Sequence, residues 1–90
     1  MKKITFQDVV SDLRCGREIE FVYGGKNYSI TSSGGYWYFY CEQTKETVKI
    51  AAFNDKERLI RFVSEFCING VRLSLIFDES RYEKSSLFIL

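Results

Sequence analysis

Ninety residues are too few for two independent hydrophobic cores and enough for one, so we expect a single domain over residues 1–90. Hydrophobic residues make up 46% of the chain, which suffices for a packed core and disfavours disorder. The 13 basic and 12 acidic residues leave a net charge of +1, which argues against a protein that coats DNA. The chain has no histidine, so it lacks the usual general base and the commonest metal ligand.

The cysteines and the hydropathy pattern bear on the cellular compartment. Cys15, Cys41 and Cys67 are odd in number and show no CxxC spacing, so they predict neither a zinc site nor a disulfide framework and suit a reducing compartment. No apolar run approaches the roughly 18 residues of a membrane-spanning helix. Met1-Lys2-Lys3 leads directly into an amphipathic segment rather than a signal peptide. We therefore expect a cytoplasmic protein with no metal, no cofactor and no membrane contact.

The first predicted element is a helix over residues 6–15. Thr5 is a suitable N-cap, and Asp8 follows at the position that completes a capping box. Gly16 can take the left-handed conformation that ends the helix. Apolar residues recur with helical spacing and predict the buried stripe Phe6, Val9, Val10 and Leu13.

The middle of the chain predicts a four-stranded antiparallel meander. Gly24-Gly25 reads as a two-residue hairpin turn, and residues 32–35 and 42–45 read as four-residue loops. Counting outward from these turns predicts the pairs Ile19–Ile30, Phe21–Tyr28, Ile30–Trp37, Tyr28–Phe39, Phe39–Val48 and Trp37–Ile50.

All three turns agree on which side chains share a face. A slip of one residue would move every side chain to the other face, so this agreement is strong evidence for the meander. The predicted core face consists of Ile19, Phe21, Tyr28, Ile30, Trp37, Phe39, Val48 and Ile50. The opposite face is polar except for tyrosines, and consists of Glu18, Glu20, Val22, Asn27, Ser29, Thr31, Tyr36, Tyr38, Tyr40, Thr47 and Lys49.

A second helix is predicted to begin at Asn54, with Glu57 completing a capping box, and to end at Asn69-Gly70. Its predicted buried stripe is Leu59, Phe62, Val63, Phe66 and Cys67. Residues 71–82 fit either a strand or a short helix, and we favour the helix because Asp78-Glu79 continues without a turn residue. The apolar residues 87–90 are expected to dock on the core or to extend a sheet edge. The chain is thus predicted to be an α+β domain, with two main helices packed on one face of the meander.

The candidate binding residues are Tyr36, Tyr38 and Tyr40 with Lys49 and Lys26. Three tyrosines in a row on a polar face are typical of a contact surface, although they fit an ordinary mixed surface equally well. Carboxylate pairs such as Glu18 with Glu20 lie in no catalytic motif, and a solvated edge explains them better. No glycine arrangement matches a phosphate-binding fingerprint, so we expect no enzymatic activity.

Four segments of the sequence together resemble a known group of proteins. The segments 16–21 (GREIEF), 25–30 (GKNYSI), 37–39 (WYF) and 75–79 (LIFDE) resemble a group of small, mostly uncharacterised proteins of phages, prophages and other mobile elements of Gram-positive bacteria. These motifs are turns and core positions, so the resemblance supplies no active-site residues. It implies an accessory protein that acts on a host factor or a host defence system.

These observations lead to three ordered hypotheses for function. The first is a non-enzymatic binding protein that engages and inhibits a bacterial host protein through the tyrosine face. The alternative is sequestration of a small nucleotide-like signalling ligand in a tyrosine-lined site, with an oligomer interface left open. The third is binding of single-stranded nucleic acid, which the near-neutral charge and the two glutamates disfavour.

Overall fold

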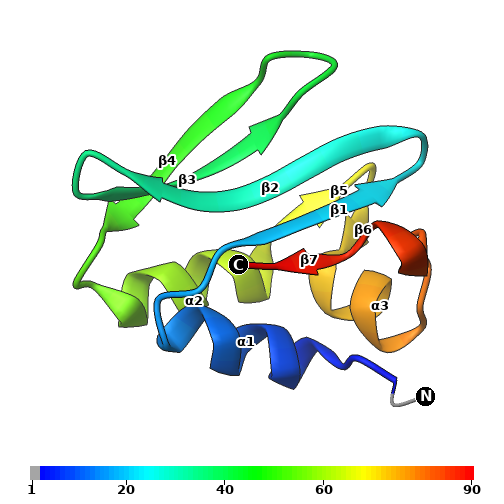
Figure 1. Cartoon of the computed structure of the whole chain (residues 1–90), viewed down its shortest axis with the longest axis horizontal. Helices are drawn as coiled ribbons and strands as arrows, with labels where there is room; N and C mark the ends of the chain where they lie inside the picture. Colours follow the sequence, from blue (N-terminus) through cyan, green and yellow to red (C-terminus); the bar gives the residue numbers. More distant parts are fainter. Residues whose placement is uncertain (1–2) are drawn as a thin grey trace.

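Three helices lie on one face of a five-stranded antiparallel sheet in the computed structural model of the chain, which describes residues 3–90 (Figure 1). Met1 and Lys2, where the sequence predicts no signal peptide, lie outside the described residues. The strands of the sheet follow the order β4-β3-β2-β1-β7. Along the chain the elements are α1 (Phe6–Arg14), β1 (Ile19–Tyr23), β2 (Lys26–Ser33), β3 (Tyr36–Cys41), β4 (Thr47–Ala52), α2 (Lys56–Glu65), β5 (Cys67–Ile68), β6 (Val71–Arg72), α3 (Leu73–Asp78), the 3-10 turn η1 (Lys84–Ser86) and β7 (Phe88–Ile89).

Helix α1 confirms the first predicted element and ends one residue earlier than expected. The Thr5 hydroxyl accepts a hydrogen bond from the Asp8 N–H at 3.2 Å, and the Asp8 carboxylate accepts one from the Thr5 N–H at 2.9 Å. The Asp78 carboxylate, at the end of α3, accepts a further bond from the Phe6 N–H at 2.7 Å. The start of α1 is therefore held by its own capping box and by a distant helix.

The first hairpin is confirmed and the second has a different register. Phe21 lies opposite Tyr28 as predicted. The predicted pairs Ile30–Trp37 and Tyr28–Phe39 are wrong, because Ile30 lies opposite Phe39. The loop is shorter than the predicted residues 32–35, because Ser32 and Ser33 belong to β2. Gly34-Gly35 alone forms the turn, with φ of 59° and 87°. Two consecutive residues with positive φ fit the tight turn that matches strand twist.

The third hairpin keeps its predicted loop but contains a β-bulge. Phe39 lies opposite Val48 as predicted, whereas Trp37 lies opposite Ala51 and not Ile50. The register shifts between Trp37 and Tyr38, so Ile50 is the extra residue on β4. Ile50 and Ala51 are consequently both buried, although they are neighbours in one strand.

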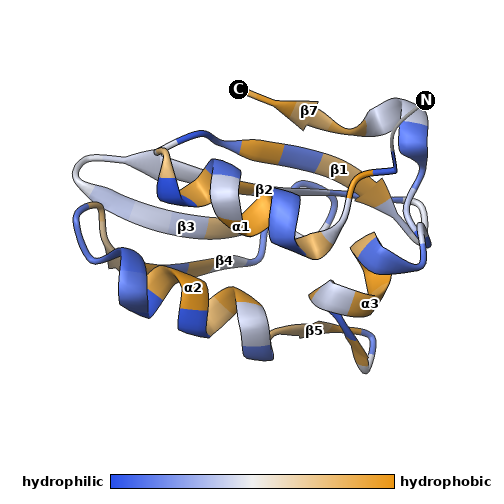
Figure 2. Cartoon of the chain, turned by 90° about the horizontal axis from the view of Figure 1, so that it is seen from below, coloured by the Kyte–Doolittle hydropathy of each residue, from blue (hydrophilic) through white to orange (hydrophobic). Residues whose placement is uncertain are grey.

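The predicted core face survives both register errors. The β2–β3 register is displaced by two residues, which preserves the alternation of side chains, so those wrong pairs still joined residues on the correct face. The β3–β4 register is displaced by one residue beyond the bulge, and there Ile50 stays buried because the bulge buries it together with Ala51. All eight residues predicted for that face are buried except Val48, which is partly buried against the core. Figure 2 shows the three helices, each carrying hydrophobic and hydrophilic residues, on this side of the sheet.

Helix α2 starts one residue later and ends earlier than predicted. Asp55 is the N-cap, not Asn54, and its carboxylate accepts a hydrogen bond from the Arg58 N–H at 3.1 Å. Leu59 and Val63 are buried as expected, and Phe62 and Phe66 are partly buried against the core. Cys67 was predicted to be buried on the helix, but it is exposed in β5, because the helix ends at Glu65.

The position of this N-cap gives a direct test of the corrected boundary. We expect Asp55→Ala to lower the free energy of unfolding by about 0.5–2 kcal/mol, because it removes the acceptor for a helix-terminal N–H. Asn54→Ala, one residue earlier, is the matched control and should change stability by less than about 0.5 kcal/mol. Urea denaturation of both variants checks the prediction, and a larger loss for Asn54→Ala would contradict it.

The segment after α2 combines the two alternatives that the sequence left open. Asn69-Gly70 does not end a helix: it is the turn of a small hairpin formed by β5 and β6, with φ of 52° and 79°. Residues 73–78 then form the favoured short helix, α3. Near the end of the chain, β7 pairs antiparallel with β1 and adds a fifth strand to the predicted four. This extension of the sheet edge is one of the two placements expected for residues 87–90.

Candidate protein-binding face

The sheet has one face covered by helices and one that no helix covers, here called the outer face (Figure 1). Strand β3 places three tyrosines on it, because alternate residues of a strand point to opposite sides. The inward neighbours Trp37, Phe39 and Cys41 are buried, whereas Tyr36 is 40% exposed and the other two tyrosines are partly exposed. The predicted row of Tyr36, Tyr38 and Tyr40 therefore lies on the outer face.

Small hydroxyl side chains flank this row on the neighbouring strand. Tyr40 lies opposite Ser29, Tyr38 opposite Thr31 and Tyr36 opposite Ser33. These residues are too short to cover an aromatic ring. The tyrosine row is thus the largest aromatic feature on this half of the outer face, with polar neighbours that tolerate water.

Lys49 lies beside the row, as the sequence predicted, and is engaged there. It pairs with Tyr38 across β3 and β4, and its Nζ lies 3.6 Å from the centre of the Tyr36 ring. An ammonium over an aromatic face is attracted by the ring quadrupole. Lys49 therefore contacts the Tyr36 ring through a cation–π interaction.

Lys26 lies on the other side of the sheet from the tyrosines. It is two residues before the buried Tyr28 on β2, so both side chains start from the core face. Lys26 lines a cavity of about 290 Å³ together with Cys41, Phe66 and Cys67. The structure brings Lys49 to the tyrosine row and does not bring Lys26 there.

Cys41 is buried on the core side of β3, as predicted. Burial raises the pKa of its thiol, but hydrogen bonds from Thr44 and from the backbone N–H of Gln43, together with nearby Lys26, hold the pKa below the usual 9.0. Cys15 and Cys67 are exposed. Within residues 3–90, no three cysteines, aspartates or glutamates gather as a metal site would require.

The carboxylates that are close in sequence, Glu18 with Glu20 and Asp78 with Glu79, have different partners in the structure. Glu18 accepts hydrogen bonds from the Ser32 N–H at 2.8 Å and from the Ser32 hydroxyl at 3.3 Å. Asp78 caps α1, and Glu79 pairs with Arg81. Glu20 is exposed on the outer face, and its carboxylate has no hydrogen bond or ion pair to any residue from 3 to 90. Only Glu20 of this group is therefore available on the outer face.

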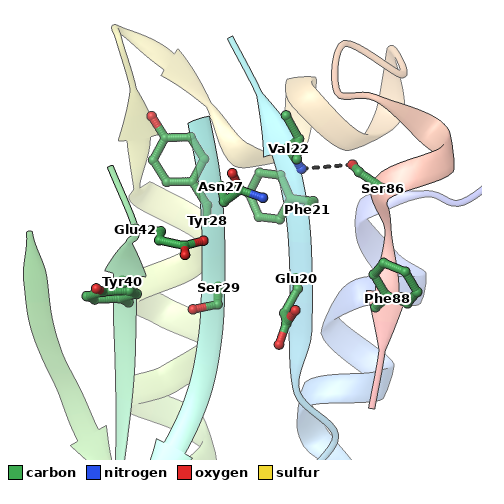
Figure 3. A pocket seen from close by; sticks show the side chains of 10 residues that line it. All are labelled: Glu20, Phe21, Val22, Asn27, Tyr28, Ser29, Tyr40, Glu42, Ser86 and Phe88. Atoms are coloured by element: carbon green, nitrogen blue, oxygen red, sulfur yellow. Dashed lines mark hydrogen bonds between the residues drawn. The ribbon is translucent and has the colours of Figure 1, made fainter. Parts of the chain in front are cut away.

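A hollow of about 310 Å³ lies on the outer face beside the tyrosine row, and we call it the outer hollow (Figure 3). Tyr40 and Glu42 flank it from the β3 side and Phe88 from β7, with Glu20 and Ser29 between them. Its full lining is Glu20, Phe21, Val22, Asn27, Tyr28, Ser29, Tyr40, Glu42, Ser86 and Phe88.

The outer hollow as a unit was not predictable from the sequence, because its far wall comes from β7. Phe88 is 58% exposed and lies opposite Glu20, so it stands on the outer face at the edge of the sheet. Residues 87–90 were expected to extend a sheet edge, which is where Phe88 lies. The strand with which they pair and the register of that pairing were not predictable.

No family model matches this chain, and neither the curated proteins nor the solved structures include a significant match. The resemblance to proteins of mobile elements therefore stays a prediction. Within residues 3–90, none of the helices is long and apolar enough to cross a membrane.

Proposed function

We propose that this chain is a non-enzymatic binding protein of a phage or another mobile element, and that it engages and inhibits a bacterial host protein through its outer face. The observation that carries the binding role is the row of Tyr36, Tyr38 and Tyr40 on a sheet face that no helix covers. The mobile-element origin and the inhibition rest on the sequence resemblance alone.

Tyrosine is suited to this role because it offers a large contact area with few rotatable bonds. Aromatic residues are enriched at the centres of protein interfaces, where they act as anchors. The sheet holds Tyr38 and Tyr40 by main-chain pairing on both sides, through Thr31 and Lys49 for Tyr38. Such a surface binds with little loss of backbone freedom.

A nucleotide-like ligand ranks second on the same face. A phosphate requires converging cations or backbone N–H groups, and the one predicted cation beside the row, Lys49, already lies over the Tyr36 ring. The outer hollow next to the row carries Glu20 and Glu42, which repel anions. The same carboxylates disfavour single-stranded nucleic acid.

The proposed function is tested by capture from a bacterial lysate with the tagged chain, followed by titration of the purified partner. Tyr38→Ala combined with Tyr40→Ala should weaken partner binding by about 1,000-fold, since interface anchors contribute about 2 kcal/mol or more each and every 1.4 kcal/mol is about tenfold. The partner's own activity should fall when the unmodified chain is added.

The control variant is Glu57→Ala combined with Arg61→Ala, which changes exposed residues of α2 on the helix side. It should capture the partner as the unmodified chain does. Equal loss of binding in both variants would contradict a role for the tyrosine row. Stoichiometric binding of a nucleotide in calorimetry, abolished by Tyr38→Ala, would replace the proposal with the sequestration hypothesis.

A further inference from the structure

The outer hollow has a chemical character that the tyrosine row does not have. Its lining includes the carboxylates of Glu20 and Glu42 and no lysine or arginine. Neither carboxylate has a hydrogen bond or an ion pair with any residue from 3 to 90. The chain as a whole has a net charge of +1, so this local excess of negative charge is not a property of the entire surface.

Several of the other polar groups around the outer hollow are already paired. The Asn27 side-chain oxygen accepts a hydrogen bond from Gln43 Nε2 at 2.6 Å, and the Asn27 backbone N–H donates to Gln43 Oε1 at 2.8 Å. The backbone N–H of Val22 donates to the Ser86 hydroxyl at 2.8 Å. Among the described residues, the two carboxylates are the charged groups that line the outer hollow without a partner.

Aromatic side chains stand on both sides of these carboxylates. Tyr40 comes from β3 and Phe88 from β7, with β2 and β1 between them (Figure 3). Strands in a sheet are about 4.8 Å apart, so the two rings rise roughly 14 Å from each other across the hollow. Phe88 exposes 58% of its surface, so its ring is accessible to a partner at this edge of the sheet.

We propose that the outer hollow binds an arginine side chain on a basic segment of the protein partner. A guanidinium is planar and always charged: it can donate two hydrogen bonds to a carboxylate while its face stacks on an aromatic ring. The outer hollow offers both features, since two carboxylates and the rings of Tyr40 and Phe88 are among its lining residues. The inference rests on the proposed function for the presence of a protein partner, since Tyr40 belongs both to the tyrosine row and to the outer hollow.

Arginine fits better than the other cations that this chemistry admits. A divalent metal requires several oxygen ligands in one coordination sphere, and the described residues show no such group. A lysine ammonium is a point charge that cannot fork to a carboxylate and stack at the same time. The outer hollow spans several strands, which suits a segment that presents side chains in succession.

The test is calorimetric titration of the full chain with a short blocked peptide that carries arginine at alternating positions, at about 150 mM salt. Peptides with lysine or glutamate at the same positions serve as probes of charge alone. We expect the arginine peptide to bind more tightly than the lysine peptide and the glutamate peptide not to bind. Glu20→Gln and Glu42→Gln should each weaken arginine binding by about tenfold, because each removes a charge-assisted hydrogen bond.

The matched control is Glu57→Gln, which removes one exposed carboxylate from α2 without touching the outer face. It should leave the arginine affinity unchanged. Equal weakening by Glu57→Gln would overturn the proposal in favour of unspecific charge attraction, and so would equal binding of the lysine peptide. Self-association in native mass spectrometry that Glu20→Gln abolishes would also overturn it, since a second copy would then be the occupant.

This result is distinguishable from that of the proposed function. If Tyr38→Ala with Tyr40→Ala abolishes partner capture while Glu20→Gln and Glu42→Gln leave partner affinity unchanged, the proposed function stands and the arginine site falls. If the arginine peptide binds as expected and no partner is captured, the site stands and the proposed function falls.

Discussion

Replacing Trp37 with alanine is expected to lower the free energy of unfolding by about 3–5 kcal/mol. The side chain is 0% exposed, and its ring stacks on Phe53 with the centres 5.4 Å apart and the planes at 9°. Its indole N–H donates to the Phe53 carbonyl at 3.1 Å, which Lys56 Nζ also contacts at 3.1 Å. Because Lys56 still donates to that carbonyl in the variant, the expected loss comes mainly from packing and the cavity.

The measurement is equilibrium unfolding in urea, with the slope checked for two-state behaviour. Tyr36→Ala, at the preceding position on β3, is the matched control and should cost less than about 1 kcal/mol, because that ring is 40% exposed. Trp37→Phe should lie between them, since it keeps most of the apolar bulk and loses one hydrogen bond. A larger loss for Tyr36→Ala than for Trp37→Ala would mean that the two faces of the sheet are inverted.

Replacing Ile76 with alanine is the second change with a large expected effect, about 2–5 kcal/mol. Ile76 is 0% exposed on α3, whereas its neighbour Leu75 is 41% exposed. In the strand alternative for this segment the pattern would be reversed, since Leu73, Leu75 and Phe77 would share the buried face. Leu75→Ala should therefore cost less than about 1 kcal/mol, because the residue is exposed and alanine favours a helix.

Thermal or urea unfolding of Ile76→Ala and Leu75→Ala distinguishes a helix from a strand at residues 73–78. A small loss for Ile76→Ala together with a large loss for Leu75→Ala would show that residues 73–78 are not helical. Circular dichroism of both variants at low temperature is the control, since each must retain the native spectrum for the comparison to be valid.

The inner face of the sheet was determined by the sequence alone because side-chain alternation in a strand has a period of two. The assumed loop at residues 32–35 displaced β3 by two residues against β2, and that error left Trp37 and Phe39 on the correct face. The capping box of Thr5 and Asp8 was equally readable, since it involves residues three apart. Patterns of this kind are predictable because they depend only on residues that are close in sequence.

The hairpin at Asn69-Gly70 shows where local patterns became ambiguous. The same dipeptide is suited to the end of a helix and to a two-residue hairpin turn, because both require positive φ. Packing decided between them: α2 ends at Glu65, and the Leu73 N–H donates to the Phe66 carbonyl at 3.0 Å, which closes the hairpin. Cys67 was misplaced for this reason.

The tyrosine row was predictable from the sequence, because its three members alternate along a single strand and alternate residues share a face. The outer hollow was decided by the tertiary structure, since Glu20, Glu42 and Phe88 lie on different segments and meet only when β7 pairs with β1. A two-residue strand has too few alternating positions to specify its partner or register. The main-chain bonds from Leu90 to Glu18 at 2.7 Å and from Glu83 to Val22 at 2.9 Å fix that pairing, and with it the placement of Phe88 across from the tyrosines.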